Sequence, residues 1–88
     1  MPAPKVTVYT TSYCPYCVRA KALLKKKGVA FEEVQVEGDD ALRAWLVERS
    51  GQRTVPQIFA GERSLGGFSD LDALDRDGKL DSILRGDG

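Results

Sequence analysis

The chain has 88 residues and a formal net charge of zero, from 13 basic and 13 acidic residues. This length favours one small domain over residues 1–88, and the balanced charge argues against binders of nucleic acid or anionic membranes, which need a basic excess. No apolar run approaches the roughly 20 residues of a membrane span, and the start, MPAPKVTVYTT, lacks a signal-peptide pattern, so we expect a cytoplasmic protein.

The first predicted elements form a strand–helix–strand unit. Residues 5–10, KVTVYT, are β-branched and aromatic and predict a strand. Residues 15–27 predict a helix that ends at Gly28, with Pro15 suited to its first turn. Its apolar residues at helical spacing are Val18, Ala22 and Leu23. Residues 29–36, VAFEEVQV, predict a second strand, which should run parallel to the first because one helix separates them.

The next segment predicts a helix followed by a hairpin. Asp39 or Asp40 can cap a helix that runs to about Ser50 and stops at the following glycine. Residues 55–60, VPQIFA, predict a short strand, and the segment AGERS turns the chain into another strand near residues 64–65.

The last segment predicts a third helix and a short helical tail. Residues 69–72, SDLD, resemble a capping-box start after a pair of glycines. The tail, GKLDSILRGDG, predicts one or two more helical turns before it frays. The whole order predicts a small α/β sheet with helices on both faces.

The chain has only two cysteines, Cys14 and Cys17, and no histidine. As a structural disulfide, this four-residue loop would add about 2 kcal/mol at most. A zinc site would need two further cysteine or histidine ligands, so a metal would require two chains or an outside thiol, as in a dimeric iron–sulfur protein. A redox-active dithiol fits the position better. Cys14 lies near the helix N-cap, where N–H groups favour its thiolate, and Cys17 lies one turn further, within disulfide reach.

Three motifs together resemble the dithiol glutaredoxins: CPYC after the first strand, TVPQIF in the middle and GGFSDL near the end. The similarity runs from Val6 to about Leu84. It implies a thioredoxin-like, three-layer α/β fold with a four-stranded mixed sheet flanked by helices. It also implies a glutathione-dependent thiol–disulfide oxidoreductase, in which Cys14 attacks and Cys17 resolves the mixed disulfide.

The resemblance further implies the partners. Glutathione would be the co-substrate, and no metal is expected. Disulfide-containing or glutathionylated proteins would be the substrates, with ribonucleotide reductase among the candidates. The chain would act as a monomer, without nucleic acid or membrane.

The implied glutathione contacts come from three segments. A cis peptide bond before Pro56 would face the cysteines and turn the Val55 backbone toward the cysteinyl residue of glutathione; the alternative is an ordinary strand-start proline. Helix N–H groups at Ser69 and Asp70 would take the γ-glutamyl carboxylate, and the Asp70 side chain its ammonium; the alternative is that both only cap the helix. The implied set is Tyr16, Arg43, Arg53, Thr54, Val55, Pro56, Gly67, Phe68, Ser69 and Asp70.

The glycine carboxylate of glutathione needs cations. Arg43 and Arg53 are the main candidates, and Gln57 is a weaker one. Many family members carry a lysine three residues before the first cysteine, where this chain has Thr11. This departure puts one glycine-carboxylate contact in doubt. Trp45 is assigned to core packing.

Two other functions stay open. One is a redoxin that a flavoprotein reductase regenerates in place of glutathione; such relatives usually lack the features seen at Ser69 and Asp70. The other is a dimeric carrier of a [2Fe–2S] cluster. Its usual members have glycine or serine after the first cysteine, whereas Pro15 stiffens the turn here.

Overall fold

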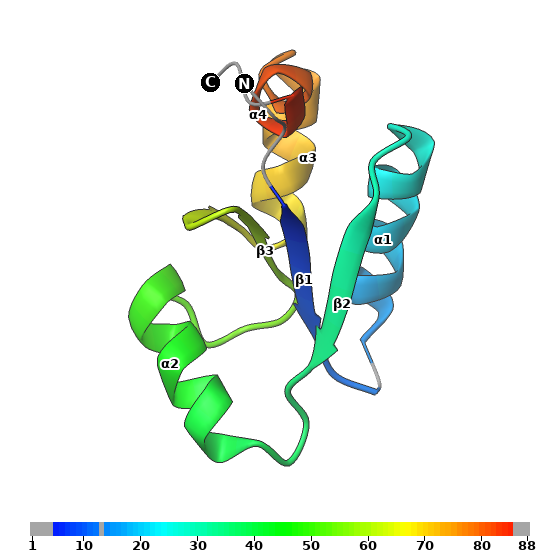
Figure 1. Ribbon diagram of the computed structural model, residues 1–88. Helices are drawn as coiled ribbons and strands as arrows, with labels where there is room; N and C mark the ends of the chain where they lie inside the picture. The colour runs from blue at the N-terminus through cyan, green and yellow to red at the C-terminus, as the bar shows by residue number, and fades with distance from the viewer. Residues whose placement is uncertain (1–4, 13, 86–88) are drawn as a thin grey trace.

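The computed structural model describes residues 5–12 and 14–85, in eight elements (Figure 1). The predicted fraying of the tail after residue 85 lies outside the described residues. In chain order the elements are β1 (Val6–Thr10), α1 (Pro15–Lys26), β2 (Phe31–Gln35), α2 (Asp40–Ser50), β3 (Gln57–Ala60), β4 (Arg63–Gly66), α3 (Phe68–Arg76) and α4 (Leu80–Arg85).

The four strands form one mixed sheet in the order β2-β1-β3-β4. β1 pairs with β2 in parallel, with Val6 opposite Phe31, as the single intervening helix predicts. β3 is antiparallel to β1 and forms a hairpin with β4. This confirms the expected fold, a four-stranded mixed sheet flanked by helices, and it places the end of β1 beside the start of β3.

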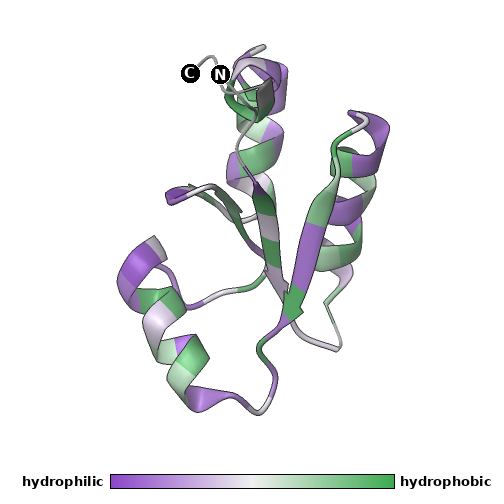
Figure 2. Cartoon of the chain, in the orientation of Figure 1, coloured by the Kyte–Doolittle hydropathy of each residue, from purple (hydrophilic) through white to green (hydrophobic). Residues whose placement is uncertain are grey.

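Helices cover both faces of the sheet, so the chain has two cores. The larger core lies between the sheet and α1, α3 and α4, and it includes Val8, Leu24, Ile58, Leu71 and Leu80. The smaller one lies under α2 and joins Val36, Leu46 and Phe59. Figure 1 shows α2 apart from the other helices, on its own side of the sheet. In Figure 2 the hydrophobic bands of β1 contrast with the hydrophilic middle of β2, an edge strand.

The helix ends follow the local signals in the sequence. α1 begins after Cys14 as its N-cap and ends before Gly28, whose φ of 73° suits a residue without Cβ. Asp39 caps α2 by accepting a hydrogen bond from the Leu42 N–H at 3.0 Å, and Gly51 closes it with a φ of 74°. Among the described residues, no helix is long and apolar enough to cross a bilayer.

The buried side of α1 differs from the prediction. Val18 is 63% exposed and Ala22 is also exposed, whereas Cys17, Ala20 and Leu24 are buried. The side of α1 that packs on the sheet is therefore formed by Cys17, Ala20 and Leu24.

Other element starts also differ from the prediction, by one residue at β1, which begins at Val6. β2 begins at Phe31 because the N–H of Val29 donates to the Leu24 carbonyl at the end of α1. β3 begins at Gln57, since its pairing with β1 starts there. α3 begins at Phe68 with Gly67 as its N-cap, two residues before the Ser69 N-cap that the capping-box pattern predicts.

Trp45 packs as predicted but stays partly open to solvent. Its ring stacks on Phe59 at 5.9 Å between centroids and lies 5.7 Å from the Tyr9 ring. The side chain is 38% exposed, and Arg49 covers part of it at 5.9 Å from the ring centroid.

Candidate active site

The two cysteines lie at the junction of β1 and α1 and form a disulfide, with 5.1 Å between their Cα atoms. Cys14 is half-buried, whereas Cys17 is 2% exposed and belongs to the core side of α1. The N–H of Cys17 donates to the Cys14 sulfur at 3.1 Å. An N–H group of the first helical turn therefore points at the sulfur that incoming molecules can reach, as the N-cap position predicts.

A proline loop faces the cysteines from the start of β3. The peptide bond between Val55 and Pro56 is cis, as the resemblance implies. The Cys14 sulfur lies 3.6 Å from the Val55 carbonyl oxygen. Because Val55 precedes the β3 ladder, its backbone is not part of the sheet. The loop thus brings backbone that lies outside the sheet next to the Cys14 sulfur.

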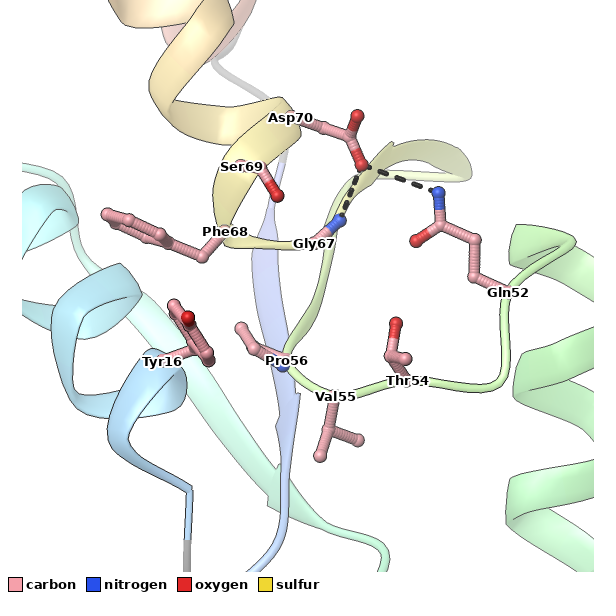
Figure 3. A pocket seen from close by; sticks show the side chains of 9 residues that line it. All are labelled: Tyr16, Gln52, Thr54, Val55, Pro56, Gly67, Phe68, Ser69 and Asp70. Carbon is pink, nitrogen blue, oxygen red and sulfur yellow. Dashed lines mark hydrogen bonds between the residues drawn. The ribbon is translucent and has the colours of Figure 1, made fainter.

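A groove of about 450 Å³ opens beside this loop. We call it the cis-proline groove, and Figure 3 shows how its side chains lie. The rings of Tyr16 and Phe68 lie together at one end of it, with their centroids 6.2 Å apart (Figure 3). Its lining residues are Tyr16, Gln52, Thr54, Val55, Pro56, Gly67, Phe68, Ser69 and Asp70.

The proline loop forms one wall of the groove, and the N-terminus of α3 forms the wall across from it (Figure 3). The Gly67 N–H donates to the Asp70 carboxylate at 3.1 Å, so Asp70 does cap the helix as one reading of the sequence expects. The same carboxylate lines the groove. Ser69 also lines the groove, but the N-cap is Gly67 instead. An added Cβ on Gly67 would lie 3.3 Å from the Pro56 carbonyl oxygen, so the small residue lets the two walls approach closely.

The structure overturns the assignment of Gln57 as a carboxylate contact. Its side chain is fully buried. The amide nitrogen donates to the Thr54 carbonyl oxygen at 2.8 Å and to the Gln52 amide oxygen at 2.9 Å. A residue tied inward in this way holds the loop and does not reach a ligand.

Sequence reasoning missed Gln52. It lines the cis-proline groove, and its amide nitrogen lies 3.4 Å from the Asp70 carboxylate (Figure 3). No motif marks it, and its place between the end of α2 and the TVP segment is the only available signal.

Arg43 and Arg53 lie on the far side of the proline loop. Both line a small depression, which shares Gln52, Thr54 and Val55 with the cis-proline groove. The two cations therefore gather next to the groove but not inside it. Such a placement provides positive charge for a ligand group that extends past Val55.

The loop before Cys14 is tied to the segment after β2. The Ser12 N–H donates to the Glu37 carboxylate at 3.2 Å, and the Ser12 hydroxyl contacts the same oxygen. These hydrogen bonds from Ser12 lower the pKa of Glu37 below its ordinary value. These hydrogen bonds hold the segment that contains Thr11. At this position many members of the resembled family have a lysine. Among residues 5–12 and 14–85, no group of three or more histidine, cysteine, aspartate or glutamate side chains is arranged to hold a metal ion.

Comparisons with known proteins agree on one family. The sequence profile of the Glutaredoxin family matches residues 6–65. The chain is 54% identical over 81 residues to a glutaredoxin of Pseudomonas aeruginosa, covering 92% of this chain and 96% of the relative. It is 51% identical over 80 residues to glutaredoxin 3 of Escherichia coli K12, covering 91% and 96%.

Solved structures show the same likeness. A buckwheat glutaredoxin–glutathione complex is 34% identical with a TM-score of 0.86, covering 92% of this chain and 76% of that one. The solution structure of a Brucella melitensis glutaredoxin is 49% identical with a TM-score of 0.86, covering 97% and 92%.

Proposed function

The chain belongs to the glutaredoxin family and is a thiol–disulfide oxidoreductase, and from this premise we propose how its own residues perform the reaction. The family uses glutathione, and one structural relative is a complex with it. We propose that Cys14 is the attacking thiolate, that Cys17 is the resolving thiol, and that glutathione binds in the cis-proline groove. The juxtaposition of the Cys14 sulfur, the Cys17 N–H and the Val55 carbonyl carries this proposal.

The exposure of the two sulfurs supports their roles. Half-buried Cys14 can meet a substrate disulfide, and the helix N–H aimed at its sulfur stabilises negative charge there. Buried Cys17 is reached only from within the protein, by the sulfur that it already bonds. This asymmetry fits a first attack by Cys14 and a later, internal attack by Cys17.

With a protein disulfide, the reaction takes two exchange steps. The Cys14 thiolate attacks one substrate sulfur, a mixed disulfide forms, and the other substrate sulfur leaves as a thiolate that takes up a proton. The Cys17 thiolate then attacks Cys14, which releases the reduced substrate and leaves the Cys14–Cys17 disulfide. Two glutathione molecules restore the dithiol in two further exchanges and leave as one glutathione disulfide, so electrons balance.

With a glutathionylated protein, Cys14 works without its partner. Its thiolate attacks the glutathione sulfur, the protein thiolate leaves, and glutathione stays bound to Cys14. A second glutathione then attacks that bound sulfur and frees Cys14. In this route the groove must hold the glutathione moiety in line with Cys14 and does not need to recognise the protein.

The groove offers a partner for each part of glutathione. The Val55 backbone, which lies outside the sheet, suits the cysteinyl residue, as in the addition of a short extended strand. The N-terminus of α3 suits the γ-glutamyl carboxylate, and the Asp70 carboxylate suits its ammonium. Arg43 and Arg53 suit the glycine carboxylate beyond Val55. The groove volume of about 450 Å³ is within the range of small-molecule sites, roughly 300–1,000 Å³.

We also propose the setting of this reaction. Glutathione keeps thiols reduced in the cytoplasm, and we place the protein there. It would act as a monomer on disulfide-containing or glutathionylated proteins.

The cysteine variants test the proposal. The measurement is glutathione-dependent reduction of a small glutathione mixed disulfide by wild type, Cys14→Ser and Cys17→Ser. We expect Cys14→Ser to lose the activity and Cys17→Ser to keep it, because deglutathionylation needs one thiolate only. Full activity in Cys14→Ser would overturn the assignment. Oxidised protein that a flavoprotein reductase reduces, but glutathione does not, would support the alternative reductant.

A further inference from the structure

A buried amide fixes the orientation of the proline loop. Gln57 places its amide nitrogen 2.8 Å from the Thr54 carbonyl oxygen, which can only accept a hydrogen bond. The nitrogen, and not the oxygen, must therefore face this loop. The same nitrogen donates to the Gln52 amide oxygen at 2.9 Å. Gln57 thus determines which end of the Gln52 amide points inward.

This orientation leaves the Gln52 amide nitrogen pointing at the other wall of the groove. It lies 3.4 Å from Asp70 Oδ2, a long and therefore weak hydrogen bond (Figure 3). The Gln52 backbone is also held, because its N–H donates to the Ser50 hydroxyl and its carbonyl accepts from it, both at 3.1 Å. Hydrogen bonds thus connect the Thr54 carbonyl in the proline loop to the Asp70 carboxylate in α3. They run through the side-chain amides of two residues, Gln57 and Gln52.

The connection uses one of the two Asp70 oxygens. Oδ2 accepts from both the Gly67 N–H and Gln52. Oδ1 accepts none of the hydrogen bonds found among the described residues, and the carboxylate lines the groove. We propose that Gln52 is a positioning residue: it holds the Asp70 carboxylate where it meets the γ-glutamyl ammonium of glutathione. This inference rests on the proposed function of the groove.

If Gln52 positions Asp70, its effect on affinity depends on whether the ligand carries an amine. Gln52 would raise affinity for ligands that carry an amine at the γ-glutamyl end and would do nothing for ligands that lack it. It would not change the exchange chemistry, since it does not touch either sulfur. A residue that merely stabilised the loop would affect both kinds of ligand alike.

The test compares two substrates. One is a small glutathione mixed disulfide, and the other is the same disulfide of glutaryl-cysteinyl-glycine, which lacks only the amine. Gln52→Met keeps the length of the side chain but removes its amide, and with it both the donor to Asp70 and the oxygen that accepts from Gln57. Gln35→Ala, at an exposed position of β2, is the control. We expect Gln52→Met to raise KM for the glutathione substrate about five-fold at unchanged kcat, equal to about 1 kcal/mol. KM for the amine-free substrate should not change, and Gln35→Ala should match wild type with both.

Asp70→Asn separates this inference from the proposed function. We expect it to raise KM for the glutathione substrate, and adding Gln52→Met should then cost nothing more. If Asp70→Asn leaves KM unchanged, the proposed ammonium contact is wrong. If Asp70→Asn raises KM but Gln52→Met does not, or if Gln52→Met raises KM equally for both substrates, only the role given to Gln52 is wrong.

Discussion

Replacement of Gly66 by alanine should lower the stability of the fold and disturb the cis-proline groove. Gly66 ends β4 with a φ of 89°, a conformation that costs an L-residue roughly 1–2 kcal/mol. Its added Cβ would also lie 2.8 Å from Asp70 Cβ and Cγ, closer than atoms can pack. The Asp70 side chain must therefore move away, and it would lose its hydrogen bond from the Gly67 N–H.

The magnitude follows from these two effects. A hydrogen bond to a charged group contributes about 1.5–3 kcal/mol, so Gly66→Ala should destabilise the fold by roughly 3 kcal/mol in total. For a domain of this size, that corresponds to a fall in Tm of roughly 12–24 °C. The variant should still fold at room temperature, since small domains have about 5–15 kcal/mol in hand.

A second glycine isolates the clash from the strain. Gly78, between α3 and α4, has a φ of 73°, and an added Cβ there meets nothing within 4 Å. Gly78→Ala should lose only roughly 1–2 kcal/mol and keep the wild-type KM for glutathione. Urea unfolding and steady-state kinetics on both variants measure the difference. Two results together would refute this prediction: Gly66→Ala has the same free energy of unfolding as Gly78→Ala, and its KM for glutathione is no higher.

Two further predictions concern the fold. Leu24→Ala should cost about 2–5 kcal/mol, because this side chain is fully buried in the larger core. The exposed Val18→Ala on the same helix should stay within about 0.5 kcal/mol, and equal urea midpoints for the two would contradict the burial. Hydrogen bonds from Lys21 and Thr10 lower the pKa of Glu33, so ionised Glu33 stabilises the folded state. Wild type should lose this stabilisation as pH falls below about 4.5 and through the lowered pKa. In Glu33→Gln the free energy of unfolding should fall less at acid pH than in wild type, with a difference well under about 1 kcal/mol because the ion pair is exposed. The same pH dependence of unfolding in both proteins would contradict this.

The element order was predictable because local rules determine it. An aspartate cap at Asp39 or Asp40, the stop at Gly51 and the proline after Cys14 each act within one helical turn. The structure confirms all three, with Asp39 as the cap. The two cysteines were also predictable as a pair for the same reason. The buried stripe of α1 was not, since Val18 and its apolar neighbours give a pattern compatible with more than one face.

The site was predictable in outline but not in its side-chain contacts. The motifs indicated the proline loop and the start of α3, and the structure brings both to one groove. Gln57 was wrongly considered as a contact for the glycine carboxylate. A strand pattern does not reveal that a polar side chain is buried under a loop and bonded to the backbone of that loop. Gln52 was missed because its bond to Asp70 joins segments 18 residues apart, which no local pattern encodes. The contacts of Arg43 and Arg53 with a ligand stay a prediction.

The most direct test of the account is the position of glutathione when it is bound to Cys14. The Cys17→Ser variant treated with glutathione disulfide should form one mixed disulfide, because no second thiol can resolve it. Nuclear Overhauser effects in that adduct should connect the cysteinyl residue to Val55 and the γ-glutamyl group to Ser69 and Asp70. Glutathione attached to Cys14 without contacts to either segment, and with the shifts of the groove residues unchanged, would contradict the account.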